Sequence, residues 1–163
     1  MQMPIQSVEV KAAIFSLKKG KAPGNGFTPE FFISAWPIVG LMVVEAVQEF
    51  FRNGRMLRQA KFAVISLAPK KATVNKIKDY RPISCCNTIY KSISKILADT
   101  IRNCIGNLVG PAQSTFIPGR RIADNVLLAQ ELLLGYGSMR GPKGCVIQFD
   151  IEKAFDSVDW GFL

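Results

Sequence analysis

The amino-acid sequence predicts an α+β fold, and three observations lead to that prediction. Helical periodicity dominates the first third of the chain. Strand-like and helical segments then follow one another without regular alternation, which argues against a doubly wound parallel sheet. The chain has 163 residues, of which 48% are hydrophobic, so its composition is that of one globular domain with a core.

The first third of the chain contains three predicted helical segments. Ser7 caps the first, which ends near Gly20, and its apolar face comprises Val10, Ala13, Ile14 and Leu17. Thr28-Pro29 starts the second, because threonine caps a helix and proline suits its first turn. After an interruption at Pro37, a longer helix runs to about Arg52. Its predicted buried stripe comprises Val39, Val43, Ala46, Val47 and Phe50.

The loop 21–27 between the first two helices contains three helix-breaking residues, Pro23, Gly24 and Gly26. Glycine lets the backbone approach a ligand closely, and Lys21 is suited to meet a phosphate. An ordinary surface turn explains the same residues equally well.

The middle of the chain predicts a hairpin with a basic loop. The run 62–68 has strand character, Pro69 ends it, and a return strand follows at 80–84, where Pro82 is compatible only with a strand end or edge. The loop between the strands carries Lys70, Lys71, Lys76 and Lys78. Such an arm is suited to a phosphate backbone or a triphosphate.

Two more helices are predicted beyond the hairpin. Asn87 caps the first, which stops at Gly106-Asn107 and has an apolar face made of Ile89, Ile93, Ile96, Leu97, Ile101 and Cys104 or Ile105. A loop with Arg120-Arg121 follows, and paired arginines beside glycine favour a phosphate or template contact. The competing account is that Asp124 neutralises one arginine. A leucine-rich helix near 122–134 and a flexible connection over 135–144 complete this part.

The apolar run Val146–Phe149 has strand length, and Asp150 stands at its end. Hard divalent cations such as Mg²⁺ favour a carboxylate held in this way. The alternative is that Asp150 only caps the segment that follows, where Ala154, Phe155 and Val158 recur at helical spacing.

The charge of the chain is unevenly distributed. The net charge is +9, and the segment from Arg52 to Arg102 alone carries twelve Lys/Arg against Asp79 and Asp99. The stretch from Asp150 onward is acidic. A basic middle and an acidic end suit a protein that holds nucleic acid with one part and a metal ion with the other. The alternative is that these cations only solvate helix faces.

None of the four cysteines belongs to a Cys-x-x-Cys pair, and the chain has no histidine. A zinc site and histidine-based acid–base chemistry are therefore not expected. We find no signal peptide and no apolar run of bilayer-spanning length. The sequence thus predicts an intracellular protein, nuclear or cytoplasmic, with reduced thiols and without membrane contact.

Four blocks of residues, in this order along the chain, resemble the N-terminal part of the reverse transcriptase domain of plant LINE-type (non-LTR) retrotransposons. The blocks are Lys21-Ala22-Pro23-Gly24 with Gly26-Phe27; Tyr80-Arg81-Pro82-Ile83-Ser84-Cys85-Cys86-Asn87 with Tyr90-Lys91; Gln113-Ser114-Thr115-Phe116 with Gly119-Arg120 and Asp124-Asn125; and Phe149-Asp150 with Lys153-Ala154-Phe155-Asp156-Ser157-Val158. Together with the helices between them, they cover nearly the whole chain.

The resemblance implies an RNA-directed DNA polymerase that uses an RNA template, a DNA primer, dNTPs and Mg²⁺. It also implies the helix-rich fingers and the start of the palm of a right-hand polymerase fold, with an incomplete sheet. Residues 1–140 would be mostly fingers, and residues 141–163 would contain the first palm strand with the first catalytic aspartate.

The resemblance also implies a role for individual residues. Asp150 would bind the catalytic Mg²⁺ ions, helped by the Ile151 carbonyl group, and Phe155 would exclude a 2′-hydroxyl beneath the nucleotide sugar. The positions that approach the triphosphate are Lys70, Lys71 and Arg81. The positions on the template side are Gln113, Gly119 and Arg120.

The sequence departs from the family pattern in two places. The family commonly has Lys-Ala-Pro-Gly-x-Asp-Gly, whereas only Asn25 separates Gly24 from Gly26 here. No Asp-Asp pair, which supplies the other metal-binding carboxylates in the family, occurs in the chain. We therefore expect a truncated domain that does not polymerise DNA alone and that leaves the 145–149 strand unpaired and its apolar surface exposed. A nucleic-acid-binding remnant without catalysis and a non-functional transposon relic are the alternatives.

Overall fold

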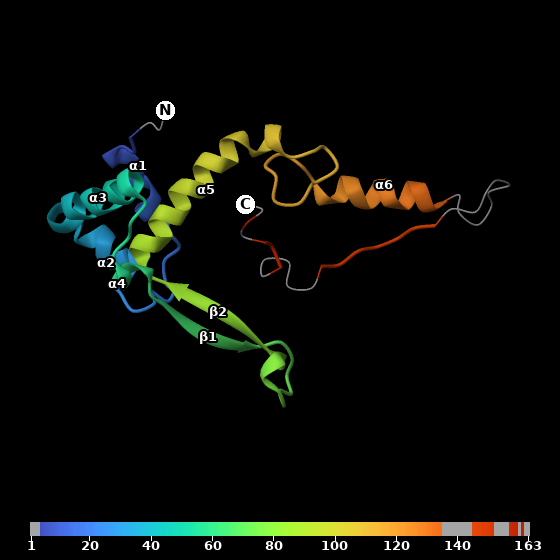
Figure 1. Cartoon of the computed structure of the whole chain (residues 1–163), viewed down its shortest axis with the longest axis horizontal. Helices are drawn as coiled ribbons and strands as arrows, with labels where there is room; N and C mark the ends of the chain where they lie inside the picture. The colour runs from blue at the N-terminus through green and yellow to red at the C-terminus, as the bar shows by residue number, and fades with distance from the viewer. Residues whose placement is uncertain (1–3, 135–144, 152–156, 160, 162–163) are drawn as a thin grey trace. The chain divides into compact units, whose positions relative to one another are not determined.

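The computed structural model describes residues 4–134, 145–151, 157–159 and 161. The chain falls into two compact units, Met1–Val109 and Gly110–Leu163 (Figure 1). The elements of the first unit are α1 (Ser7–Phe15), α2 (Pro29–Ser34), α3 (Trp36–Asn53), α4 (Arg58–Lys61), β1 (Ala63–Pro69), the 3₁₀ turn η1 (Ile77–Asp79), β2 (Tyr80–Cys86) and α5 (Thr88–Leu108). The second unit contains α6 (Ile122–Leu134). The described residues are thus mostly helical, with one two-stranded antiparallel sheet.

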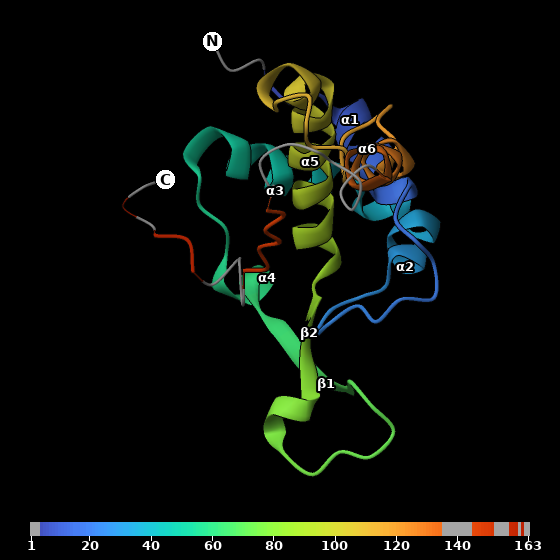
Figure 2. The ribbon, with the colours of Figure 1, turned by 90° about the vertical axis from the view of Figure 1, so that its right-hand side faces the viewer.

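The core of the first unit lies where α1, α3 and α5 pack against one another (Figure 2). Its buried residues are Val10, Ala13, Ile14, Val43, Val44, Val47, Ile93 and Ile96. On α3 the buried positions Gly40, Val43, Val44 and Val47 follow the i, i+3, i+4, i+7 spacing of one helix face. The packing of apolar stripes from three helices therefore positions the hairpin that leaves the start of α5.

Local capping signals fix the start of two helices as predicted. The Thr28 hydroxyl group accepts a hydrogen bond from the Phe31 N–H, and Pro29 occupies the first position of α2. The Asn87 side-chain oxygen accepts the Ile89 N–H at 2.8 Å at the start of α5. Gly54, with φ of 68°, ends α3 in the left-handed conformation that glycine adopts without strain.

Several predicted positions are wrong in detail. Gln6, not Ser7, is the N-cap of α1, and the Glu9 carboxylate accepts the Gln6 N–H at 2.7 Å. This helix ends at Phe15, several residues before Gly20. Ala46 is exposed because it lies just outside the stripe of α3 that faces the core.

Helix α5 also departs from its predicted extent and burial. It continues through the expected stop at Gly106-Asn107 to Leu108. Its apolar face is buried at Ile93 and Ile96, whereas Leu97 and Ile101 are exposed. The core residues of α1 and α3 therefore cover the first half of that face only.

The predicted hairpin is confirmed. Strands β1 and β2 are antiparallel over seven residue pairs, from Ala63 opposite Cys86 to Pro69 opposite Tyr80. Pro82 lies opposite Leu67 in a sheet of only two strands, where both strands are edges and the missing proline N–H is tolerated. The hairpin projects away from the helices of its unit, as both views show (Figures 1 and 2).

In the second unit, α6 has the predicted bounds. The run Cys145–Phe149, by contrast, has no regular secondary structure, so the predicted strand is wrong. Its apolar side chains are exposed, Phe149 by 84%. A strand requires a paired neighbour, and no described residue pairs with this run. The predicted connection over 135–144 lies outside the described residues.

None of the helices in the described part of the chain combines the length and the apolar character that a membrane span requires.

Candidate nucleic-acid interface

The loop at the hairpin tip is organised around Asp79. Its carboxylate accepts the backbone N–H groups of Asn75 at 3.2 Å and Lys76 at 3.1 Å, and it forms an ion pair with Lys71 at 3.0 Å. The Asp79 carbonyl oxygen accepts the Lys70 N–H at 2.8 Å, which closes the hairpin beyond its last strand pair. The side chain of Asp79 is only 13% exposed, so this carboxylate forms the inner support of the loop.

The structure divides the hairpin cations into two classes. Lys70 donates from Nζ to the Lys78 carbonyl oxygen at 2.8 Å, and Lys71 pairs with Asp79. Of the three residues predicted to approach a triphosphate, Lys70 and Lys71 thus hold the loop itself. Among the described residues, the side chains of Lys76, Lys78 and Arg81 have no polar partner. These three exposed groups are the cations available to an external anion.

The pKa of Asp79 lies below its ordinary value, first because of the hydrogen bond from Lys71 and next because of the Asn75 N–H. Since the folded-state pKa is lowered, the contribution of this carboxylate to loop order is complete above the ordinary value of 3.8. It is lost as the pH falls through the lowered pKa.

We expect Asp79→Asn to open the tip loop at neutral pH, because the substitution removes the charge that Lys71 and two amides recognise. Amide hydrogen exchange at Asn75 and Lys76 should then accelerate about tenfold or more, whereas the thermal midpoint of the unit should stay nearly unchanged. In the native chain the same amides should lose protection only under acidic conditions. Unaltered exchange in Asp79→Asn would contradict this role.

The loop 21–27 packs against the start of α5. The Thr88 hydroxyl group, which is fully buried, donates to the Phe27 carbonyl oxygen at 2.6 Å. Lys91 donates from Nζ to the Ala22 carbonyl oxygen at 2.7 Å. Gly24 has φ of 68°, and a Cβ atom there would lie 2.5 Å from the Cys85 carbonyl oxygen. The close approach that glycine permits is therefore to the protein's own backbone.

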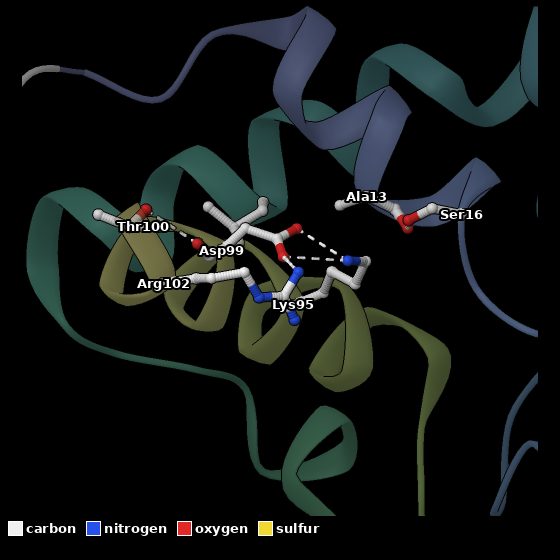
Figure 3. A network of polar contacts seen from close by, with 7 residues as sticks. Ala13, Ser16, Lys95, Asp99, Thr100 and Arg102 are labelled. Carbon is white, nitrogen blue, oxygen red and sulfur yellow. Dashed lines mark hydrogen bonds and ion pairs between the residues drawn. The ribbon is translucent and has the colours of Figure 1, made fainter. Parts of the chain in front are cut away.

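The other acidic residue of the basic middle, Asp99, is also paired. Its carboxylate accepts hydrogen bonds from Lys95 at 2.8 Å and Arg102 at 3.1 Å, all on α5 (Figure 3). The pKa of Asp99 is lowered, mainly by the hydrogen bond from Lys95. Asp99 thus pairs with Lys95 four residues before it and with Arg102 three residues after it, all on one helix. Lys95 and Arg102 therefore share one carboxylate, which offsets one of their two positive charges.

In the second unit, Arg120 joins the two ends of the loop that precedes α6. Its guanidinium group donates to the Gly110 carbonyl oxygen and, at 2.6 Å, to the Gln113 carbonyl oxygen. Gly119 has φ of 80°, which explains glycine at that position. The structure therefore brings the three predicted template-side residues into one loop, in which Arg120 contacts backbone.

Two further residues, Asn125 and Phe116, contribute to the structure and surface of the same loop. Asn125 donates from its side chain to the Ala112 carbonyl oxygen at 2.9 Å. Phe116 has φ of 65°, and its side chain is 93% exposed. The loop is thus fixed by side-chain contacts to its backbone and presents one aromatic ring to solvent.

Asp150 and Ile151 are exposed and lie in a segment without regular secondary structure. Carboxylate and carbonyl oxygens are the ligands that Mg²⁺ prefers, so the donors are of the right kind. Among the described residues, however, no three Asp, Glu, Cys or His side chains gather into a possible metal site. The described residues alone do not make a complete magnesium site. Phe155 lies outside the described residues.

Sequence reasoning missed the roles of Asp79, Thr88 and Lys91. It counted Asp79 only as a charge, placed Lys91 in a family block without a contact, and did not single out Thr88. Asp79 directly precedes the Tyr80-Arg81 block that resembles the family, and this position in the sequence could have indicated its role. The contacts of Thr88 and Lys91 span more than sixty residues and leave no local pattern in the sequence.

Comparison with known proteins decides the family. The sequence model of the family described as "Reverse transcriptase (RNA-dependent DNA polymerase)" matches residues 68–163, which is more than half of the chain. The chain belongs to the reverse transcriptase family. Membership in this family implies a polymerase fold, and proteins of the family generally depend on Mg²⁺.

Two relatives of this reverse transcriptase chain come from transposable elements. The chain is 34% identical over its whole length to the "Transposon TX1 uncharacterized 149 kDa protein" of Xenopus laevis. It is 25% identical over 94% of its length to the "Retrovirus-related Pol polyprotein from type-2 retrotransposable element R2DM" of Drosophila melanogaster. The chain spans 12% and 14% of the length of these two relatives.

Proposed function

We propose that the chain is part of an RNA-directed DNA polymerase of a non-LTR, LINE-type retrotransposon. The observation that carries this proposal is the family match over residues 68–163, which includes the tip loop and second strand of the hairpin, the Gln113–Arg120 loop and Asp150. The names of the two relatives, a transposon protein and a retrotransposable-element polyprotein, support the element type. The finer assignment to plant elements rests on the residues of the four blocks, and the compartment would be the nucleus or the cytoplasm.

In this proposal, residues up to about 140 supply most of the fingers, and residues 141–163 lead into the palm. The hairpin holds its arm in shape with Lys70, Lys71 and Asp79, and it offers Lys76, Lys78 and Arg81 to phosphates. Arginine suits this task because its planar guanidinium group can hold two phosphate oxygens at once. Template RNA, primer DNA and dNTPs are the proposed partners.

Asp150 and the Ile151 carbonyl group are the proposed Mg²⁺ ligands, and Phe155 is the proposed barrier to a 2′-hydroxyl group. Bound Mg²⁺ would stabilise the negative charge that develops when a primer 3′-hydroxyl attacks an α-phosphate. Gln113, Gly119 and Arg120 would shape the template side, and in this role Arg120 acts through the loop that it closes.

The test of this proposal is primer extension on an RNA template with dNTPs and Mg²⁺. The 163-residue chain has no Asp-Asp pair, so we expect it to incorporate no nucleotide by itself. In a longer protein that contains this chain and is active, Asp150→Asn should reduce incorporation by more than about a hundredfold, since loss even of groups that only support metal ligands costs about 10- to 100-fold.

Asp159→Asn is the matched control, because Asp159 lies outside the predicted metal site. Incorporation by the 163-residue chain that Asp150→Asn abolishes would contradict the expectation that it is inactive alone. Equal incorporation by the native longer protein and its Asp150→Asn variant would contradict the role of Asp150.

A second candidate function is binding of nucleic acid without catalysis. The observation that favours it is the presence of three exposed cations, Lys76, Lys78 and Arg81, without a polar partner among the described residues. They belong to a hairpin that projects from its unit (Figure 2). This function requires no metal site, so it is compatible with the described residues alone.

A further inference from the structure

We propose that the loop 21–27 sets the direction of the β1–β2 hairpin relative to α5, with Gly24, Thr88 and Lys91 as positioning residues. That the direction of the hairpin matters for substrate binding rests on the proposed function, in which the hairpin cations contact phosphates. The positioning itself follows from the contacts at the hairpin root, by which we mean residues 85–87.

The hairpin root is a short connection, and its local structure alone does not fix the direction of the hairpin relative to α5. Strand β2 ends at Cys86, α5 begins at Thr88, and Asn87 is the single residue between them. Asn87 has extended φ and ψ of −61° and 151°. The dihedral angles of one junction therefore relate the hairpin to the helix, and a change of a few degrees there would swing the whole arm.

The loop contacts this junction from outside. A Cβ atom at Gly24 would lie 2.5 Å from the Cys85 carbonyl oxygen, 3.1 Å from the Cys86 carbonyl carbon and 3.3 Å from the Asn87 nitrogen. A Cβ atom at Gly26 would lie 2.9 Å from the Asn87 side-chain nitrogen. Two glycines of one loop thus lie against all three residues of the root. A side chain at Gly24 would displace backbone, whereas one at Gly26 would displace the end of the Asn87 side chain.

Two hydrogen bonds from α5 hold the loop in this place. Thr88 binds the Phe27 carbonyl oxygen at 2.6 Å, and Lys91 binds the Ala22 carbonyl oxygen at 2.7 Å. Residues three apart lie on the same side of a helix, so both donors face the loop. One holds the loop after Gly24 and the other holds it before Gly24. The loop therefore acts as a brace between α5 and the hairpin root.

The experiment measures the direction of the hairpin. Spin labels are attached through non-canonical amino acids at Ala72 in the tip loop and at Ala98 on α5, two exposed positions, so that all native cysteines remain. Double electron–electron resonance on the full chain then gives the distribution of the distance between the labels. Circular dichroism verifies that each variant is folded.

Gly24→Ala is the decisive variant and Gly20→Ala is its matched control. The two glycines have φ of 68° and 67°, so alanine strains the backbone equally at both, but nothing lies within 4 Å of a Cβ atom at Gly20. Since the seven-residue strands are about 23 Å long, a displacement of about 1 Å at the root should move the tip by several ångströms. We expect a shifted or broadened distance distribution for Gly24→Ala and the native distribution for Gly20→Ala.

Lys91 supplies a second, milder variant in case Gly24→Ala does not fold. Lys91→Met should broaden the distribution because the loop loses one anchor, whereas Lys91→Arg keeps a donor and should restore it. A native distribution in the folded Lys91→Met and Gly24→Ala chains would overturn the proposal, as would a shift in Gly20→Ala equal to that in Gly24→Ala.

Binding of single-stranded RNA to the same chains separates this inference from the proposed function. Shifted distances in chains that bind no RNA at low salt would support the brace and count against the nucleic-acid role of the hairpin. Native distances in variants that still bind RNA would overturn the brace and leave the proposed function in place.

Discussion

Replacement of Lys76, Lys78 and Arg81 by glutamine should weaken binding of single-stranded RNA by about a hundredfold at 0.1 M salt. These are the hairpin cations without a polar partner among the described residues. Each phosphate contact to a single strand contributes about 0.7 to the slope of log affinity against log salt concentration, so losing three contacts lowers that slope by about 2. A salt titration of RNA binding by fluorescence anisotropy measures both quantities.

The matched control replaces Lys11, Lys18 and Arg55 by glutamine. This variant changes the net charge by the same amount and removes the same residue types from exposed positions outside the hairpin. We expect it to retain most of the affinity and of the salt slope. Equal losses in the two variants would mean that binding depends on net charge alone and would refute a specific role for the hairpin.

The same titration distinguishes the two classes of hairpin cation. Lys71→Gln removes a charge that is already balanced by Asp79, so it should change the salt slope less than Lys78→Gln does. It should instead increase hydrogen exchange in the tip loop. This contrast separates cations that shape the arm from those that face its ligand.

The largest effect on stability is expected for Ile14→Ala. Ile14 is fully buried in the α1–α3–α5 core, so truncation to alanine leaves a cavity among packed helices. Replacing a buried isoleucine by alanine costs about 2–5 kcal/mol of the free energy of unfolding. With only eight residues in this buried cluster, the thermal midpoint should fall by more than about 10 °C.

Ile38→Ala is the control, because it makes the same chemical change on α3 at a side chain that is 82% exposed. Its thermal midpoint should stay close to that of the native chain, as is usual for surface substitutions. Thermal unfolding followed by circular dichroism compares the two variants. Similar midpoints for both would show that the three-helix core does not support the unit in solution.

Where neighbouring residues decide a structure, the sequence is sufficient to predict it. Thr28 and Asn87 cap their helices through hydrogen bonds to residues two or three positions away, so the signal lies within one turn. The hairpin was likewise predictable, since a lysine-rich loop over residues 70–79 separates two strand-like runs. The helix 122–134 has the predicted bounds for the same reason.

The sequence was insufficient where a partner distant in the chain decides the outcome. The 145–149 run has strand composition, but a strand exists only when another strand supplies its hydrogen bonds, and no described residue does so. Ala46 and Val44 differ in burial although both are small and apolar, because the direction from which α1 and α5 approach α3 selects the buried side.

The sequence by itself determined the family blocks, the hairpin and the position of its lysines, because all of these are local properties of the chain. Only the tertiary structure decided which of these cations have polar partners within the protein. Lys70 binds the Lys78 carbonyl oxygen and Lys71 pairs with Asp79 within the loop. Lys76, Lys78 and Arg81 have no polar partner among the described residues. Likewise, Gly24 touches Cys85 because folding brings together segments about sixty residues apart. Such contacts depend on the relative placement of elements in space, which no short stretch of sequence encodes.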